Sequence, residues 1–154
     1  MGTIWDTICL WLGKRKASSS SDDLKAMMEK MNRSAHNVAT SFGVTLDYTD
    51  SSVQQVESIL GKINEEFTKT RDESGLHGIA LSFAAYIGEV IRQKGLGGKW
   101  SRDHPTLGEN SFPFAWNGSE LLLYGWCEKR IFDGPGDNVW SKYNAFVLNR
   151  VSPN

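Results

Sequence analysis

The segment YIGEVIRQKGLGGKW, residues 86–100, contains the change from helical to strand-like sequence that decides the fold. Its first half continues a run in which apolar residues recur every three or four positions, the spacing of one face of a helix. Gly95, Gly97 and Gly98 then interrupt this spacing, and glycine readily takes the positive φ at which helices end. The segment therefore predicts a helix that stops at these glycines and leads into strands.

One carboxylate, Glu89, stands in the middle of this apolar run. Three small residues line the same side of the predicted helix: Gly78, Ser82 and Ala85. Such a smooth side lets another element approach closely, and a carboxylate buried there needs a partner. The candidate partners are the indole N–H of Trp100, Lys129 and Arg130. We expect these residues, with Glu89, to form a structural polar core.

Two amphipathic helices are predicted before this one. The first spans residues 22–40 and carries an apolar stripe that we assign to the core: Leu24, Met27, Met28, Met31, Ala35 and Val38. The second begins at Asp50 or Ser51, and its stripe repeats every three or four positions: Val53, Val56, Leu60, Ile63 and Phe67. Stripes of this kind indicate helices that pack against a core.

After the three glycines, the chain breaks into short apolar segments separated by turn-forming residues. Residues 99–124 predict an antiparallel sheet of about three strands, because Asn117-Gly118 is a strong hairpin signal. Pro113 should keep its strand at an edge or a bulge. Residues 127–134 fit either a fourth strand or a short helical turn.

A last helix is predicted over residues 135–148, with Asp137 as its N-cap. Its inner face should carry four residues: Val139, Tyr143, Phe146 and Val147. Helices followed by strands indicate an α+β domain. We expect the N-terminal helices to pack on one face of a small antiparallel sheet, with the C-terminal helix completing the fold.

The domain organisation expected is an amphipathic segment with a serine-rich linker over residues 1–21, followed by a single domain over residues 22–154. The apolar stretch near the start is too short to span a bilayer and contains Asp6, so we expect neither a transmembrane helix nor a signal peptide. Residues 1–16 combine apolar positions with basic ones, which leaves contact with an anionic membrane surface as an alternative.

Composition excludes several classes of function. The net charge of −1 gives no reason to expect a nucleic-acid partner. The two cysteines, Cys9 in the N-terminal segment and Cys127 in the strand-rich region, lack metal-ligand spacing, which favours a reducing cytoplasm. No catalytic, cofactor or metal-binding motif is assembled in the sequence, so we expect no cofactor, no metal and no enzyme activity.

Three residues are candidates for contact with a partner protein. Trp116 lies beside the Asn-Gly turn, and exposed tryptophans are frequent anchors in interfaces. Glu57 and Glu65 lie on the face of the second helix that we expect to be solvated. These three positions are the predicted partner-binding residues.

A set of short motifs resembles a group of small uncharacterised bacterial domains. The motifs are Tyr86-x-Gly88-Glu89-Val90, Gly98-x-Trp100, Pro113-Phe114, Lys129-Arg130 and Asp133-Gly134-Pro135-x-Asp137. The similarity covers about residues 46–150. It implies a shared fold, singles out Glu89, Trp100, Lys129 and Arg130, and implies no activity. Small stand-alone domains of this type are often suspected of being immunity proteins against secreted toxins.

The leading hypothesis is a cytoplasmic, non-enzymatic protein-binding module, such as a bacterial immunity protein that neutralises a toxin by direct binding. A first alternative is a small hydrolase or ligand-binding enzyme that brings Glu89, His104 and Arg130 together in a cleft. A second is the membrane-surface adaptor that uses residues 1–16.

Overall fold

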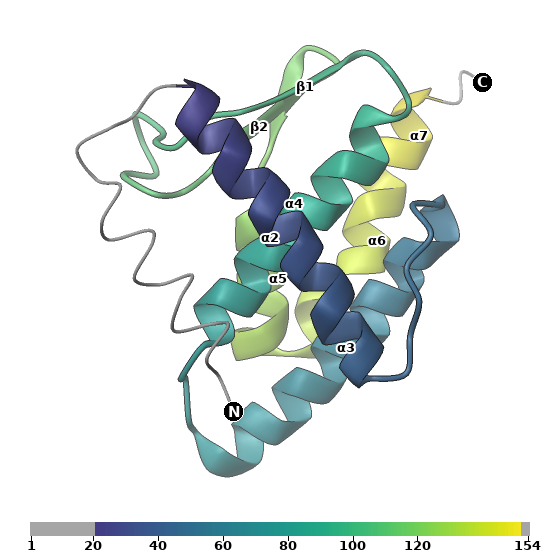
Figure 1. Cartoon of the computed structure of the whole chain (residues 1–154), viewed down its shortest axis with the longest axis vertical. Helices are drawn as coiled ribbons and strands as arrows, with labels where there is room; N and C mark the ends of the chain where they lie inside the picture. The colour runs from purple at the N-terminus through teal and green to yellow at the C-terminus, as the bar shows by residue number, and fades with distance from the viewer. Residues whose placement is uncertain (1–20, 152–154) are drawn as a thin grey trace.

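The computed structural model describes residues 21–151 and confirms the α+β fold (Figure 1). Its longer helices are α2 (Ser21–Ser41), α3 (Asp50–Thr70), α4 (Leu76–Arg92) and α5 (Leu123–Asp133). Its strands are β1 (Gly97–Trp100), β2 (Phe114–Trp116) and β3 (Ser119–Leu121). The C-terminal elements are η1 (Pro135–Asp137), α6 (Val139–Tyr143), η2 (Asn144–Leu148) and α7 (Asn149–Val151). The N-terminal segment predicted over residues 1–12 lies outside the described residues.

Helix α4 is the centre of the fold, and it contacts α2, α3, α5 and β1. Figure 1 shows α2 lying across it. The predicted close approach along the small-residue side is confirmed, because the Ser82 hydroxyl contacts the Met31 sulfur of α2 at 3.8 Å. Met27, Met28 and Met31 are buried, which confirms that the methionine stripe belongs to the core.

The sheet is antiparallel, with strand order β1-β2-β3. Asn117 and Gly118 both take positive φ, 51° and 74°, and so form the predicted hairpin turn between β2 and β3. The expectation that Pro113 holds an edge strand is wrong, because β2 is the central strand. The other alternative, a bulge, has a counterpart in the register shift between Gly97 and Lys99 of β1, opposite β2. Pro113 immediately precedes β2 and only accepts a hydrogen bond there, from the Ser101 N–H at 2.9 Å, so its missing N–H leaves the ladder intact.

Helix α5 begins earlier than the sequence indicates. The strand expected up to residue 124 ends at Leu121, and Leu123 already starts α5. Residues 127–133 are therefore helical, and Cys127 lies buried in α5 instead of in a strand-rich region. The predicted cap of the last helix is also corrected, since the side chain of Asn138, not Asp137, accepts the N–H of Ser141 at 2.9 Å.

The last helical segment contains a turn of π-helix, η2, directly after α6. Val139, Tyr143 and Val147 are buried as predicted, but Phe146 is 44% exposed, so its assignment to the inner face is wrong. A π-turn holds more residues than an α-turn because its hydrogen bonds run from i to i+5. Within this turn Val147 is buried and Phe146 is exposed.

Within residues 21–151, no helix combines the length and the apolar character that crossing a membrane requires.

Candidate functional site

The predicted partner-binding residue Glu57 is part of a buried ion pair, which corrects its assignment to the solvated face. Its Oε2 atom accepts a hydrogen bond from Arg130 Nε at 2.7 Å, and the two side chains are 13% and 9% exposed. Its Oε1 atom accepts the N–H of Val139 at 2.8 Å. Glu57 thus links α3 to α5 and to the start of α6.

Arg130 fits beside α3 because residue 61 is glycine. A Cβ atom at Gly61 would lie 2.7 Å from an Arg130 guanidinium nitrogen. Arg130 is buried and ion-paired, but its partner is Glu57 and not the expected Glu89. A buried charge pair of this kind is strongly destabilising to break, since either partner alone would be an uncompensated charge.

Trp116 is buried, and the prediction that it is available to a partner is wrong. Its indole N–H donates to the Gly95 carbonyl at 2.9 Å, which ties β2 to the loop after α4. A tryptophan beside a tight turn therefore serves the core here, where its ring is buried and its N–H has an acceptor. Glu65 is exposed on α3, as expected, and stays a predicted contact.

Glu89 is not buried, which corrects the expected arrangement of the polar core. Its side chain is 35% exposed and its Oε2 accepts from Arg92 Nε at 2.9 Å, within one turn of α4. Arg92 is 43% exposed and also donates to the carbonyl of Gly98. Lys129 is exposed on α5 and takes no part in a polar core. The expected partners of Glu89 are therefore replaced by a neighbour on its own helix.

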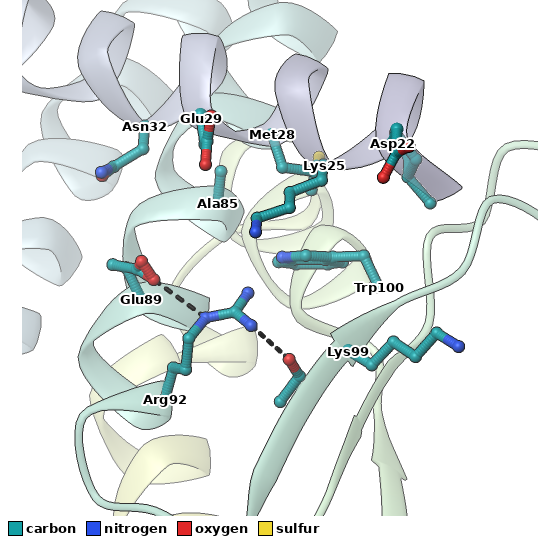
Figure 2. A pocket seen from close by; sticks show the side chains of 12 residues that line it. Asp22, Lys25, Met28, Glu29, Asn32, Ala85, Glu89, Arg92, Lys99 and Trp100 are labelled. Carbon is teal, nitrogen blue, oxygen red and sulfur yellow. Dashed lines mark hydrogen bonds and ion pairs between the residues drawn. The ribbon is translucent and has the colours of Figure 1, made fainter. Parts of the chain in front are cut away.

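Glu89 and Trp100 line a cavity of about 320 Å³ between α2 and the junction of α4 with β1 (Figure 2). We call it the Trp100 cavity. Lys25, Met28 and Glu29 of α2 form one wall, and Ala85, Glu89 and Arg92 of α4 form another.

The side chain of Trp100 packs directly against α4 at Gly88. A Cβ atom at Gly88 would lie 2.6 Å from Cζ2 of the indole, so only glycine lets the ring pack this closely. Phe114 of β2 lies against the same ring, with centroids 4.7 Å apart. The indole is therefore a rigid part of the cavity wall.

The three residues of the enzymatic alternative do not converge. Glu89 pairs with Arg92, Arg130 pairs with Glu57, and His104 lies 3.2 Å from Glu120. None of the cavities described here is lined by more than one of Glu89, His104 and Arg130. The cleft that this alternative requires is therefore not formed by them.

A larger concave surface, of about 640 Å³, lies over α5 between the 107–111 loop and η2. We call it the α5 groove. It is lined by two large apolar side chains that are exposed to solvent. Leu107 is 52% exposed and Phe146 is 44% exposed. Tyr124 and Trp126 also line it, and the rings of Trp126 and Phe146 lie 6.0 Å apart.

The polar rim of the α5 groove carries charges of both signs. Glu109, Glu128 and Lys129 all line it. Glu128 is engaged by two neighbours, Tyr124 O–H at 3.1 Å and His77 Nδ1 at 2.9 Å. Burial, together with the charge of Glu128, raises the pKa of Tyr124, so this hydroxyl stays protonated and acts as a hydrogen-bond donor.

Sequence reasoning missed this groove for identifiable reasons. Leu107 stands alone in a loop without periodicity, and Phe146 fits the apolar stripe of an ordinary α-helix. In the structure Phe146 lies in the π-turn Asn144–Leu148, where it is exposed. Exposure of these two side chains therefore depends on backbone detail that spacing does not encode.

The described residues offer little for metal or nucleophilic chemistry. No group of three or more His, Cys, Asp or Glu within residues 21–151 is placed to hold a metal ion. Burial raises the pKa of the Cys127 thiol, and a thiol that stays protonated is a poor nucleophile. The two concave surfaces, the α5 groove and the Trp100 cavity, are thus the candidate functional sites.

Comparisons of the chain with models of protein families, with curated proteins and with solved structures find no match. Its function must be argued from the geometry of these two surfaces.

Proposed function

We propose that this chain is a protein-binding module whose partner docks in the α5 groove. The observation that carries the proposal is that Leu107 and Phe146, two exposed large apolar side chains, both line one concave surface. Large apolar side chains that are exposed together around a hollow mark sites of interaction more often than isolated ones do. The same surface is lined by Tyr124 and Trp126, aromatic residues of the type enriched in interface centres.

Docking would remove this apolar surface from water, at about 25 cal/mol for each Å² buried. Phe146 is well placed to contribute, because its ring is 44% exposed and lies beside that of Trp126, with the centroids 6.0 Å apart. The π-turn that presents Phe146 supports the same conclusion, since such turns occur frequently at functional sites.

The partner that fits best is a protein segment with an apolar side chain for the surface that Leu107 and Phe146 line. On the rim, it would meet the carboxylate of Glu109 and the ammonium of Lys129. A partner carrying one basic and one acidic residue beside its apolar anchor would satisfy both. These rim charges are expected to affect specificity and association rate more than affinity.

The first experiment locates the partner on the surface. A photo-crosslinking phenylalanine analogue is placed at position 107 or 146 and expressed in cells of the source organism. Position 96 is the matched control, because Leu96 is 55% exposed and does not line the α5 groove. We expect both groove positions, and not position 96, to crosslink one common protein.

The second experiment measures affinity for the purified partner. We expect Phe146→Ala to weaken binding by about thirtyfold, the loss typical of a central aromatic anchor, and Leu96→Ala to leave it within twofold. Equal losses in the two variants, or crosslinks only to further copies of the same chain, would contradict a groove built for a different protein.

We infer further that the partner is a toxin and that this chain acts in the cytoplasm as its immunity protein. The support is the resemblance carried by motifs such as Tyr86-x-Gly88-Glu89 and Lys129-Arg130, together with a binding surface in place of a catalytic cleft. Co-expression with a toxin encoded by the adjacent gene should restore growth, and Phe146→Ala should abolish the protection. A crosslinked partner that is harmless to cells would end this inference and leave the binding function standing.

A further inference from the structure

The Trp100 cavity brings together three hydrogen-bond donors from different elements. Figure 2 shows the ammonium group of Lys25, on α2, directed toward the guanidinium of Arg92, on α4. The nitrogen of the Trp100 indole lies at the end of the ring nearest these two groups. Helices α2 and α4 and strand β1 therefore point donors at one place.

Each of these donors has capacity left for a ligand. Arg92 uses Nε for Glu89 and Nη1 for the carbonyl of Gly98. Its remaining terminal nitrogen faces the cavity (Figure 2). Figure 2 marks the hydrogen bonds and ion pairs between the residues that it draws, and it marks none for the Trp100 indole N–H or for Lys25 Nζ. Trp100 as a whole is only 8% exposed, but its N–H is not among the buried polar atoms that lack a partner, so this donor is open to the cavity.

The carboxylates around the cavity do not accept from this N–H or from Lys25 in Figure 2. Glu89 is bound to Arg92, and Asp22 and Glu29 are exposed on the α2 wall, where water and salt screen them. The lining thus carries three carboxylates and three cations, of which Glu89 and Arg92 are paired with each other. An oxyanion placed between Lys25, Arg92 and the Trp100 N–H would accept charge-assisted hydrogen bonds from all three.

We propose that the Trp100 cavity binds a small organic oxyanion, a carboxylate or a phosphate ester, attached to a flat apolar group. The volume of about 320 Å³ lies at the lower end of the range for small-molecule sites. Met28 and Ala85 provide apolar walls beside the indole, against which a planar ring can stack. The oxyanion lies between Lys25, Arg92 and the Trp100 N–H.

The structure fixes this site firmly at one side. Trp100 packs into the space left by Gly88, and Arg92 is held at two nitrogens. Preorganised donors lose little freedom when a ligand binds, which favours affinity. Lys25 is the exposed and adaptable member, so its contribution can be tested without disturbing the core.

The test uses the full chain and four probes: benzoate, phenyl phosphate, inorganic phosphate and benzylamine. Binding is followed by NMR at the indole N–H of Trp100, identified by its loss in Trp100→Phe. We expect benzoate or phenyl phosphate to shift this resonance in a saturable way, and benzylamine to leave it unchanged. Comparing the first two probes decides between carboxylate and phosphate, and inorganic phosphate alone tests the need for the flat group.

The decisive variants are Lys25→Met and Lys99→Met. Both remove one positive charge from the lining of the cavity, but Figure 2 shows Lys99 pointing away from the three donors. We expect Lys25→Met to weaken binding of the better probe by about tenfold, because a charge-assisted hydrogen bond is lost, and Lys99→Met to weaken it less than twofold. No saturable shift with either aromatic oxyanion, a stronger shift with benzylamine, or equal losses in the two variants would overturn the proposal.

Discussion

The molecule uses the same pair of residue types, an arginine and a glutamate, in two contrasting places. Arg130 and Glu57 join through a 2.7 Å contact between side chains that are almost fully buried. Arg92 and Glu89 join through a 2.9 Å contact on one turn of α4, with both side chains well exposed. The chemistry is the same, and the surroundings decide what each pair does.

Because Arg130 and Glu57 are buried, their role is to stabilise the fold. Glu57 also holds the N–H of Val139, and Gly61 clears the space that Arg130 fills. The exposed pair costs little to form or break and leaves part of the Arg92 guanidinium directed at the Trp100 cavity. We call Arg130–Glu57 the inner pair and Arg92–Glu89 the outer pair. In this fold the inner pair stabilises the folded state, and the outer pair is free to take part in binding.

The largest expected effect is loss of the inner pair. Glu57→Ala should lower the free energy of unfolding by about 3–5 kcal/mol, because Arg130 is left as a buried charge without a partner. The matched change Glu89→Ala should cost less than about 1 kcal/mol, as is typical of exposed pairs. Urea denaturation of both variants gives the measurement, and similar losses in the two would remove the distinction drawn between them.

The second prediction concerns the glycines behind the two sites. Gly88→Ala should lower the free energy of unfolding by about 2 kcal/mol, since the new methyl group would overlap the rigid Trp100 indole. Gly125→Ala is the control, because its Cβ would meet nothing closer than 3.8 Å, at Leu122. At position 125, alanine has a better helix propensity than glycine, so Gly125→Ala should raise the free energy of unfolding by about 0.5–1 kcal/mol.

Thermal or urea unfolding of the two alanine variants tests whether Gly88→Ala lowers the free energy of unfolding and Gly125→Ala raises it. If Gly88→Ala were neutral, Trp100 could move aside, and the indole would no longer be the fixed wall that the oxyanion site needs. If both variants were destabilised equally, the effect would belong to helix α4 and α5 in general and not to the contact with Trp100.

The spacing of apolar and turn-forming residues predicted helices and turns correctly where a single local requirement determines the structure. The stripe from Val53 to Phe67 has to face a core in any helix, and Asn117-Gly118 supplies the positive φ values that a two-residue hairpin requires. The small-residue side of α4 predicted the close approach of another element, and the structure shows that this element is α2. These features are local, so the sequence could reveal them.

The roles of charged residues could not be predicted in the same way. Glu57 follows the buried Val56 on α3 and resembles any solvated glutamate, while its partner is 73 positions away. Glu89 stands in an apolar run and resembles a buried residue, yet the edge of α4 at which it lies opens onto the Trp100 cavity. Which carboxylate is inside depends on how helices pack, and the spacing of either residue contains no such information.

A third and smaller effect on stability is expected when the pH changes, and it arises at the connection between α2 and α3. His36 Nε2 lies 2.8 Å from the hydroxyl of Tyr48, which sits in this connection at a φ of 64°. Partial burial lowers the pKa of His36 below its usual value. A lowered folded-state pKa contributes stability above the unfolded-state value of about 6.5, and that contribution is lost as the pH falls through the folded-state pKa.

Wild-type protein should therefore lose stability relative to His36→Gln as the pH is lowered from 8 to 5, by less than either of the larger losses above. The difference between the two proteins, measured by urea unfolding at each pH, isolates His36 from the other titrating groups. A difference that is constant across this range, or that grows in the opposite direction, would show that protonated His36 is accommodated by Tyr48 and its neighbours.

The smallest effect on stability is expected for Glu89→Gln, which keeps the shape of the side chain and removes its charge. The free energy of unfolding should change by less than about 1 kcal/mol, because the pair with Arg92 is exposed. The same change should raise the affinity of the Trp100 cavity for a bound oxyanion by about threefold, the Coulomb energy of one negative charge a few Å away in a mostly aqueous setting. If affinity fell instead, the charge of Glu89 would be required to hold Arg92 in position, and the outer pair would be as much a part of its site as the inner pair is of the core.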